Sequence, residues 1–119
     1  MAKFMELEVK GKKYYIGFSS RASVLKAERK GFMKILEDFD KSPVEGTAKL
    51  LQVGLSEKQP DITLIECNNI LNDYIDEHTS DEETADVGQI SGFIISQYNA
   101  FSGAPNGKKK AKVIPIVEM

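Results

Sequence analysis

The sequence predicts an α+β fold that is mainly helical, with an N-terminal β-hairpin packed on a bundle of four to five helices. Apolar and polar residues alternate on both sides of Lys10-Gly11, which is typical of a hairpin. Most of the remaining chain places apolar residues at helical spacing between glycine and proline breaks. With 119 residues, of which 41% are hydrophobic, the chain can bury one modest core. We expect a single globular domain over 1–103, with the hairpin at 4–18 and helices within 20–102, followed by a basic, flexible tail over 104–119.

The hairpin is expected to turn at Lys10-Gly11, so that Val9 lies opposite Lys12 in the paired strands. One face of this ribbon is then apolar and includes Met5, Leu7, Val9, Tyr14, Ile16 and Phe18. An isolated hairpin is barely stable, so this face must pack on the helices or on a partner. Met5, Leu7, Tyr14 and Ile16 are therefore candidates for an interaction surface.

Two helices are expected between the hairpin and Pro43. Ser19 or Ser20 can cap the first helix, and Gly31 interrupts the helical pattern. The second helix places four apolar residues at i, i+3, i+4 and i+7, namely Phe32, Ile35, Leu36 and Phe39.

Two capping boxes mark the next two helices. The first is Ser42-Pro43-Val44-Glu45, with proline at the first helical position. Its helix is expected to bury one stripe and to end near Gly54; the stripe consists of Val44, Ala48, Leu51 and Leu55. The second box is Thr63-Leu64-Ile65-Glu66, and the helix after it has apolar residues at Leu64, Cys67, Ile70, Leu71, Tyr74 and Ile75.

A last helix is expected to begin in the acidic stretch 79–86 and to end at Gly103. Gly88 and Gly92, four residues apart, would let another backbone approach closely, so both are candidates for a contact surface. Local flexibility explains the two glycines equally well.

Beyond this helix, residues 113–117 are apolar, but Pro115 lacks the N–H that a strand residue would donate. We expect this tail to be mobile unless a partner covers it.

No residue set in the sequence predicts catalysis, a cofactor or a metal. Cys67 falls on an apolar helical stripe and is expected to be a core residue, because a reactive cysteine needs a base and a basic environment. His78 is the only histidine and is expected at the surface near a helix end. The acids of the 79–86 stretch lack the spacing of a calcium loop. We therefore expect a binding protein and not an enzyme.

Charge is uneven along the chain, although the formal net charge is only −2. Seven acids and no lysine or arginine occur from Asp73 to Asp86, whereas Lys108, Lys109 and Lys110 form a basic run. Opposite patches favour head-to-tail self-association, although charge blocks are commonly just solvated. The lysines offer an alternative function, that of a small nucleic-acid-associated regulatory or adaptor protein. We disfavour this alternative, because lysines without interleaved arginine or aromatic residues do not discriminate between bases.

The sequence predicts neither a membrane span nor a signal peptide, so we expect a cytoplasmic protein.

The order of these elements resembles the tail assembly chaperones of long-tailed bacteriophages and related prophages, particularly those of Gram-positive hosts. The similarity covers roughly residues 4–102 and is judged by the order of the predicted elements. It rests on the hairpin from Met5 to Tyr14, the glycine-interrupted helices over 21–39, the leucine-rich segment Leu50 to Leu55, the helix over 63–77, and a last helix with Phe93, Tyr98 and Phe101.

The resemblance implies a role without catalysis. Such chaperones coat the tape measure protein, recruit tail tube subunits and leave before the virion is mature, which implies action in the bacterial host cytoplasm and self-association into many copies. Many relatives also make a longer form by translational frameshifting near the end of the short gene. Here Gly107 to Lys110 would be encoded by an A-rich run, so the residues after Lys110 are expected to have little structural role.

Overall fold

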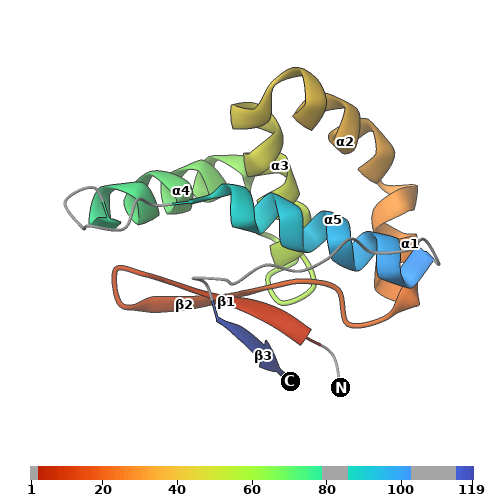
Figure 1. The fold of residues 1–119 in the computed structure, drawn as a ribbon, viewed down its shortest axis with the longest axis horizontal. Helices are drawn as coiled ribbons and strands as arrows, with labels where there is room; N and C mark the ends of the chain where they lie inside the picture. Colours follow the sequence, from red (N-terminus) through yellow and green to blue (C-terminus); the bar gives the residue numbers. More distant parts are fainter. Residues whose placement is uncertain (1–2, 79–85, 103–114) are drawn as a thin grey trace.

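The computed structural model describes residues 3–78, 86–102 and 115–119, and it confirms a mainly helical α+β fold. The sheet lies below the helices in Figure 1, and α3 runs through the middle of the helical layer. The three antiparallel strands have the order β2-β1-β3. They are β1 (Lys3–Val9), β2 (Lys12–Ile16) and β3 (Ile116–Glu118). The helices are α1 (Arg21–Arg29), α2 (Phe32–Lys41), α3 (Pro43–Leu55), α4 (Leu64–His78) and α5 (Gly88–Ser102).

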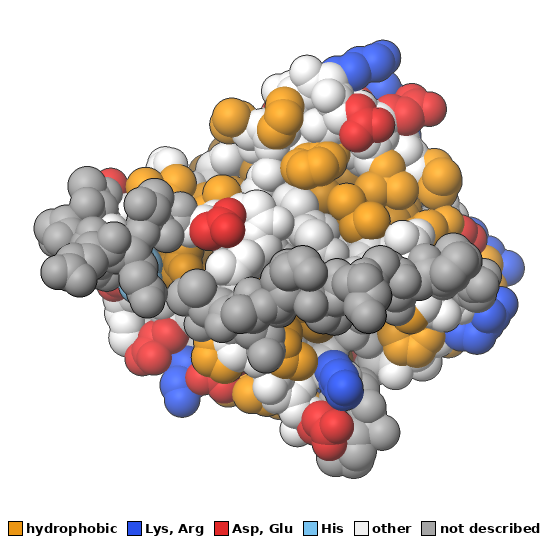
Figure 2. Space-filling model, in the orientation of Figure 1, with side chains coloured by type: hydrophobic (Ala, Val, Ile, Leu, Met, Phe, Trp, Pro, Cys, Tyr) orange, Lys and Arg blue, Asp and Glu red, His pale blue; other side chains and the backbone are white. Residues whose placement is uncertain are grey.

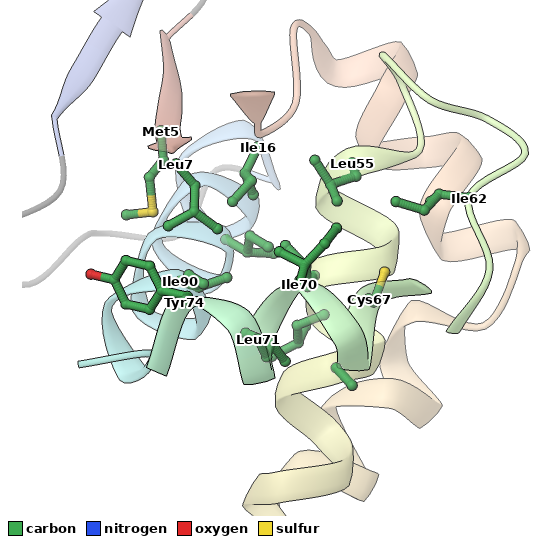
Figure 3. Close-up of a cluster of buried hydrophobic side chains, with 14 of the residues drawn as sticks. Met5, Leu7, Ile16, Leu55, Ile62, Cys67, Ile70, Leu71, Tyr74 and Ile90 are labelled. Carbon is green, nitrogen blue, oxygen red and sulfur yellow. The ribbon is translucent and has the colours of Figure 1, made fainter. Parts of the chain in front are cut away.

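The hairpin forms as predicted, with Leu7 opposite Tyr14 and Met5 opposite Ile16. Lys10 and Gly11 have φ values of 50° and 76°, the positive angles that a tight two-residue hairpin turn requires. The apolar face of the hairpin packs against the helices (Figure 3). None of the helices described over 3–78 and 86–102 is long and apolar enough to cross a membrane.

The third strand corrects the expectation of a flexible tail for the last residues of the chain. Met5 pairs with Ile116 and Phe4 with Val117, and the Glu6 N–H donates to the Pro115 carbonyl at 2.9 Å. Pro115 lies just before β3 and acts there only as an acceptor, so its missing N–H removes no bond of the strand. Residues 103–114, which include the rest of the predicted tail, lie outside the described residues.

Helix α3 contacts α2, α4, α5 and strand β2, and is therefore the centre of the core. Helix α3 ends at Leu55, next to the predicted stop, but Gly54 itself lies inside the helix. It is buried instead against Ile16 and Ile94, and its carbonyl accepts from the Gly17 N–H at 2.9 Å. Packing therefore explains this glycine better than helix termination does.

The two predicted capping boxes have different outcomes. Thr63 Oγ1 accepts from the Glu66 N–H at 3.1 Å, and Glu66 Oε1 accepts from the Thr63 N–H at 2.9 Å, so this box is confirmed. The Ser42 side chain makes no capping hydrogen bond, so the box at Ser42 is wrong, although Pro43 does occupy the first helical turn. Val44 is also not part of the buried stripe, because it is 83% exposed.

Candidate interaction surface

Helix α2 has an apolar side that the fold covers only in part. Phe32 is its one fully buried residue, while three further apolar side chains on the helix are half-buried: Ile35, Leu36 and Phe39. An amphipathic helix normally buries its apolar stripe against the core. Part of this stripe therefore remains available for contacts beyond the described residues.

Helix α5 carries more apolar residues than the core accommodates. Ile90 and Ile94 are fully buried, but four other apolar or aromatic side chains are only half-buried: Phe93, Ile95, Tyr98 and Phe101. Apolar residues on more than one side of a helix indicate contacts on more than one side. The core supplies only some of these contacts.

Tyr98 connects α5 to α1 and α2. Its ring lies 4.8 Å from the Phe32 ring, centroid to centroid, and its hydroxyl is 3.4 Å from Met33 Sδ. The hydroxyl also donates to the Glu28 carboxylate, and this bond raises the pKa of Tyr98, because ionisation would place two negative charges together. These contacts fix the end of α5 beside the start of α2.

We define the α2–α5 surface as Met33, Leu36, Ile95 and Tyr98. Met33 is 54% exposed, Leu36 follows it by three residues on α2, and Ile95 precedes Tyr98 by three residues on α5. Figure 2 shows hydrophobic side chains gathered on this face between the positions of α2 and α5. Exposed apolar patches on soluble domains commonly mark interaction sites.

The predicted glycines Gly88 and Gly92 lie along the same side of α5 as Ile95, at i, i+4 and i+7. Both are exposed, and a Cβ added at Gly92 would meet no atom of residues 3–78, 86–102 or 115–119 within 4 Å. Among the described residues no helix approaches Gly92, so its close-contact role stays a prediction about a partner. A Cβ at Gly88 would lie 3.1 Å from Asp86 Oδ1, which accepts from the Gly88 N–H.

The other predicted surface residues have different positions. Met5, Leu7 and Ile16 are 3%, 1% and 0% exposed, so they form the core and are not accessible to a partner in this fold. Tyr14 is half-buried and packs against the core. Lys108, Lys109 and Lys110 lie outside the described residues.

The two residues weighed for chemistry do not form a reactive pair. Cys67 is fully buried, as predicted, and burial raises the pKa of its thiol to about 12, with a smaller contribution from Glu66. His78 lies 11 residues later on the same helix, about 16 Å along its axis, with its ring against Tyr74. Within the described part of the chain, no three His, Cys, Asp or Glu side chains are grouped as metal ligands.

Comparisons with known proteins leave the chain without an assigned relative: no family model, no curated protein and no solved structure matches it. Sequence reasoning found the glycine side of α5 but missed Met33 and Tyr98 as neighbours. The surplus of apolar residues around α5 was the signal that pointed to a second contact side.

Proposed function

We propose that this chain is a tail assembly chaperone of a long-tailed bacteriophage or prophage, of the type found in Gram-positive hosts. In this role it binds the tape measure protein, recruits tail tube subunits during tail morphogenesis, and performs no catalysis. The proposal rests on the resemblance in element order. The structural observation that supports it is the α2–α5 surface, where two apolar helix sides are left partly uncovered.

A long helical partner with apolar stretches suits this surface. An amphipathic helix binds by placing its apolar face against a groove or face of similar character. Met33 has a flexible, polarizable side chain that adapts to differing apolar neighbours along such a partner. A partly exposed surface of this kind gives contacts weak enough to be released, and many copies on one partner compensate through avidity.

Gly88 and Gly92 add a place on α5 where a partner's backbone can come close. Because a Cβ built at Gly92 would meet no atom of the described residues within 4 Å, a partner helix can approach α5 closely there. The apolar side chains of the α2–α5 surface then lie beside the point of closest approach.

The proposal places the protein in the bacterial host cytoplasm during assembly and outside the mature virion. It also includes the longer frameshifted form expected from the A-rich coding of Lys108 to Lys110. An immunoblot of phage-producing cells with an antibody against residues 1–100 tests that part. A scarcer, larger band that shares the N-terminus supports frameshifting, and a single band contradicts it.

Co-expression with the tape measure protein from the same phage genome tests the function. The expected result is that the tape measure protein becomes soluble and co-purifies with this chain, whereas alone it is found in the insoluble fraction. A tape measure protein whose solubility is unchanged by co-expression, and which does not co-purify, would contradict the proposal.

A further inference from the structure

A cavity of about 410 Å³ opens between α1, the start of α2, the end of α3 and the loop that leads to α4. Its volume lies in the range of about 300–1,000 Å³ that is common for small-molecule sites in proteins. Each of these four segments contributes an apolar side chain to the lining, in order Ala27, Ile35, Val53 and Ile62. The first three are only half-buried, so a ligand in the cavity would remove further apolar surface from water.

The uncharged polar side chains of the lining are already bonded within the molecule. Three of them donate hydrogen bonds: Ser23 Oγ to Glu57 Oε1 at 2.7 Å, Ser56 Oγ to the Val53 carbonyl at 2.7 Å, and Gln52 Nε2 to the Ile62 carbonyl at 3.1 Å. Because these donors are engaged, the carbonyl groups of a peptide would be buried there without partners, which costs free energy. The cavity therefore favours a hydrocarbon chain over a peptide as the buried part of a ligand.

Charges are separated along the part of α1 that borders the cavity. Glu57 lies at the Ser23 end, where its Oε1 also accepts from the Ser19 N–H at 3.1 Å. Burial acts to raise the pKa of Glu57, but these bonds outweigh it and leave that pKa below its usual value, so the carboxylate is charged. Lys26 and Lys30 line the cavity further along, and Lys30 follows Ser23 by seven residues, about 10 Å along the helix axis. The cations are thus held apart from the carboxylate.

The two lysines can serve as the polar end of a binding site. Both are exposed, and across residues 3–78, 86–102 and 115–119 neither Lys26 nor Lys30 takes part in an ion pair. A lysine side chain can lie along an apolar surface with its methylene groups while its ammonium group stays in water. The complementary ligand therefore has one apolar chain and an anionic head group.

We propose that this cavity binds an unbranched, medium-chain fatty carboxylate. Its hydrocarbon chain lies against Ala27, Ile35 and Val53, and its carboxylate accepts charge-assisted hydrogen bonds from Lys26 and Lys30. The hydrocarbon chain supplies most of the affinity, because every buried methylene group contributes whereas exposed ion pairs contribute little. Binding here goes beyond the proposed function and does not depend on it, because no residue of the α2–α5 surface lines the cavity.

Isothermal titration calorimetry of the full protein with sodium decanoate, at concentrations too low for micelles to form, tests the site. Decanol and decyltrimethylammonium are matched probes, with the same hydrocarbon chain and a neutral or a cationic head group. Decanoate is expected to bind about tenfold more tightly than decanol, and decyltrimethylammonium more weakly than either. Octanoate should bind about fifteenfold more weakly than decanoate, because two fewer methylene groups are buried.

Lys26→Met tests the contact with the head group, and Lys41→Met is its matched control. Both lysines are exposed and lie in the last turn of their helices, but Lys41 does not line the cavity. Lys26→Met should weaken decanoate binding about threefold and leave decanol binding unchanged. Lys41→Met should change neither affinity. Equal decanoate affinities of the two variants would overturn the proposal.

Ala27→Leu tests the apolar end, and Ala22→Leu is the control on the same helix. The larger side chain of Ala27→Leu enters the cavity and should weaken the binding of both decanoate and decanol at least tenfold. Ala22 is exposed and does not line the cavity, so Ala22→Leu should bind both ligands like the wild type. Thermal unfolding followed by circular dichroism shows whether each variant is folded. If Ala27→Leu does not fold, the comparison of Lys26→Met with Lys41→Met decides.

Vesicles of phosphatidylglycerol distinguish a free fatty carboxylate from a membrane surface, since both present acyl chains beside an anionic group. The protein is expected to stay in the supernatant when such vesicles are sedimented. Vesicle binding without decanoate binding, no measurable decanoate binding at all, or decanoate binding that a folded Ala27→Leu variant retains in full would each overturn the proposal. None of these results bears on the binding of the tape measure protein, which co-purification measures separately.

Discussion

Gly17, directly after β2, donates its backbone N–H to the carbonyl of Gly54 in α3 at 2.9 Å, so the hairpin is joined to the central helix through two glycine backbones. A Cβ at Gly54 would lie 2.5 Å from Ile16 Cγ2 and 2.6 Å from Ile94 Cδ1. Carbon atoms in contact are normally separated by about 3.5–4.0 Å. The close approach of sheet, α3 and α5 therefore depends on the missing side chain.

Gly54→Ala is expected to destabilise the protein by roughly 1–3 kcal/mol, because Ile16 and Ile94 must both move to accommodate the methyl group. Urea unfolding followed by circular dichroism measures the effect. Gly92→Ala is the control, because Gly92 also lies inside a helix but a Cβ built there would meet no atom within 4 Å in the described part of the chain. It should stabilise the protein by roughly 0.5–1 kcal/mol. Equal effects at the two positions would contradict the packing described for Gly54.

Thr63→Ala is expected to cost about 1 kcal/mol of stability, because it removes the side-chain acceptor for the Glu66 N–H at the start of α4. Ser42→Ala is the matched control, since Ser42 precedes α3 but makes no capping bond through its side chain. Its unfolding midpoint should stay close to that of the wild type. A double-mutant cycle with Glu66→Ala should show coupling at Thr63 and none at Ser42.

The stability of the fold should fall between about pH 9 and pH 12 because of Cys67. Burial raises the pKa of its thiol from 9.0 to about 12, so above pH 9 the unfolded chain loses this proton while the folded chain keeps it. The contribution of the neutral thiol is therefore fully present below pH 9 and is lost as the pH rises toward 12, at up to about 1.4 kcal/mol per pH unit.

Comparing the wild type with Cys67→Ala isolates this contribution from the other groups that titrate at high pH. Below pH 9 the substitution lowers stability by leaving a small cavity, and the stability difference between the two proteins should shrink as the pH rises above 9. A difference that stays constant with pH would show that the thiol is not shielded from ionisation.

Removal of residues 115–119 is expected to destabilise the protein by roughly 1–3 kcal/mol, because β1 loses its pairing with β3. Hydrogen exchange followed by NMR provides the sharpest readout. The Glu6 amide, which donates to the Pro115 carbonyl, should lose protection, whereas the Gly17 amide, bonded to Gly54, should keep it. Unchanged protection at Glu6 would mean that β3 adds nothing to the sheet, as first expected for the tail.

Local patterns in the sequence were sufficient for the hairpin and for the start of α4. The alternation of apolar and polar residues around Lys10-Gly11 fixes both the strand pairing and the face that is buried. Both hydrogen bonds of the capping box at Thr63 join residues within a four-residue segment. The end of α3 near Gly54 was predictable, but the packing role of this glycine was not, since a glycine near a helix end has the same local signature whether it ends the helix or packs against a neighbour. The pairing of β3 with β1 joins the two ends of the chain, and no local signal specifies it.

The candidate surface was predictable only in part, for the same reason. The spacing of Gly88 and Gly92 follows from one helix alone, and the structure places both on the exposed side of α5. The contact of Met33 with Tyr98 joins residues 65 positions apart, so it depends on how α5 lies across α1 and α2. Met5, Leu7 and Ile16 were assigned to a surface because the sequence does not reveal that the helices of the same chain cover them.

The most direct test of the account is the amount of tape measure protein that co-purifies with Met33→Asp, compared with Val44→Asp. Both substitutions replace an exposed apolar residue by aspartate at the second position of a helix, but only Met33 belongs to the α2–α5 surface. Met33→Asp should lose most of the bound tape measure protein, because a charge must be desolvated against an apolar helix, whereas Val44→Asp should retain it. Equal recovery with the two folded variants would contradict the claim that the α2–α5 surface binds the tape measure protein.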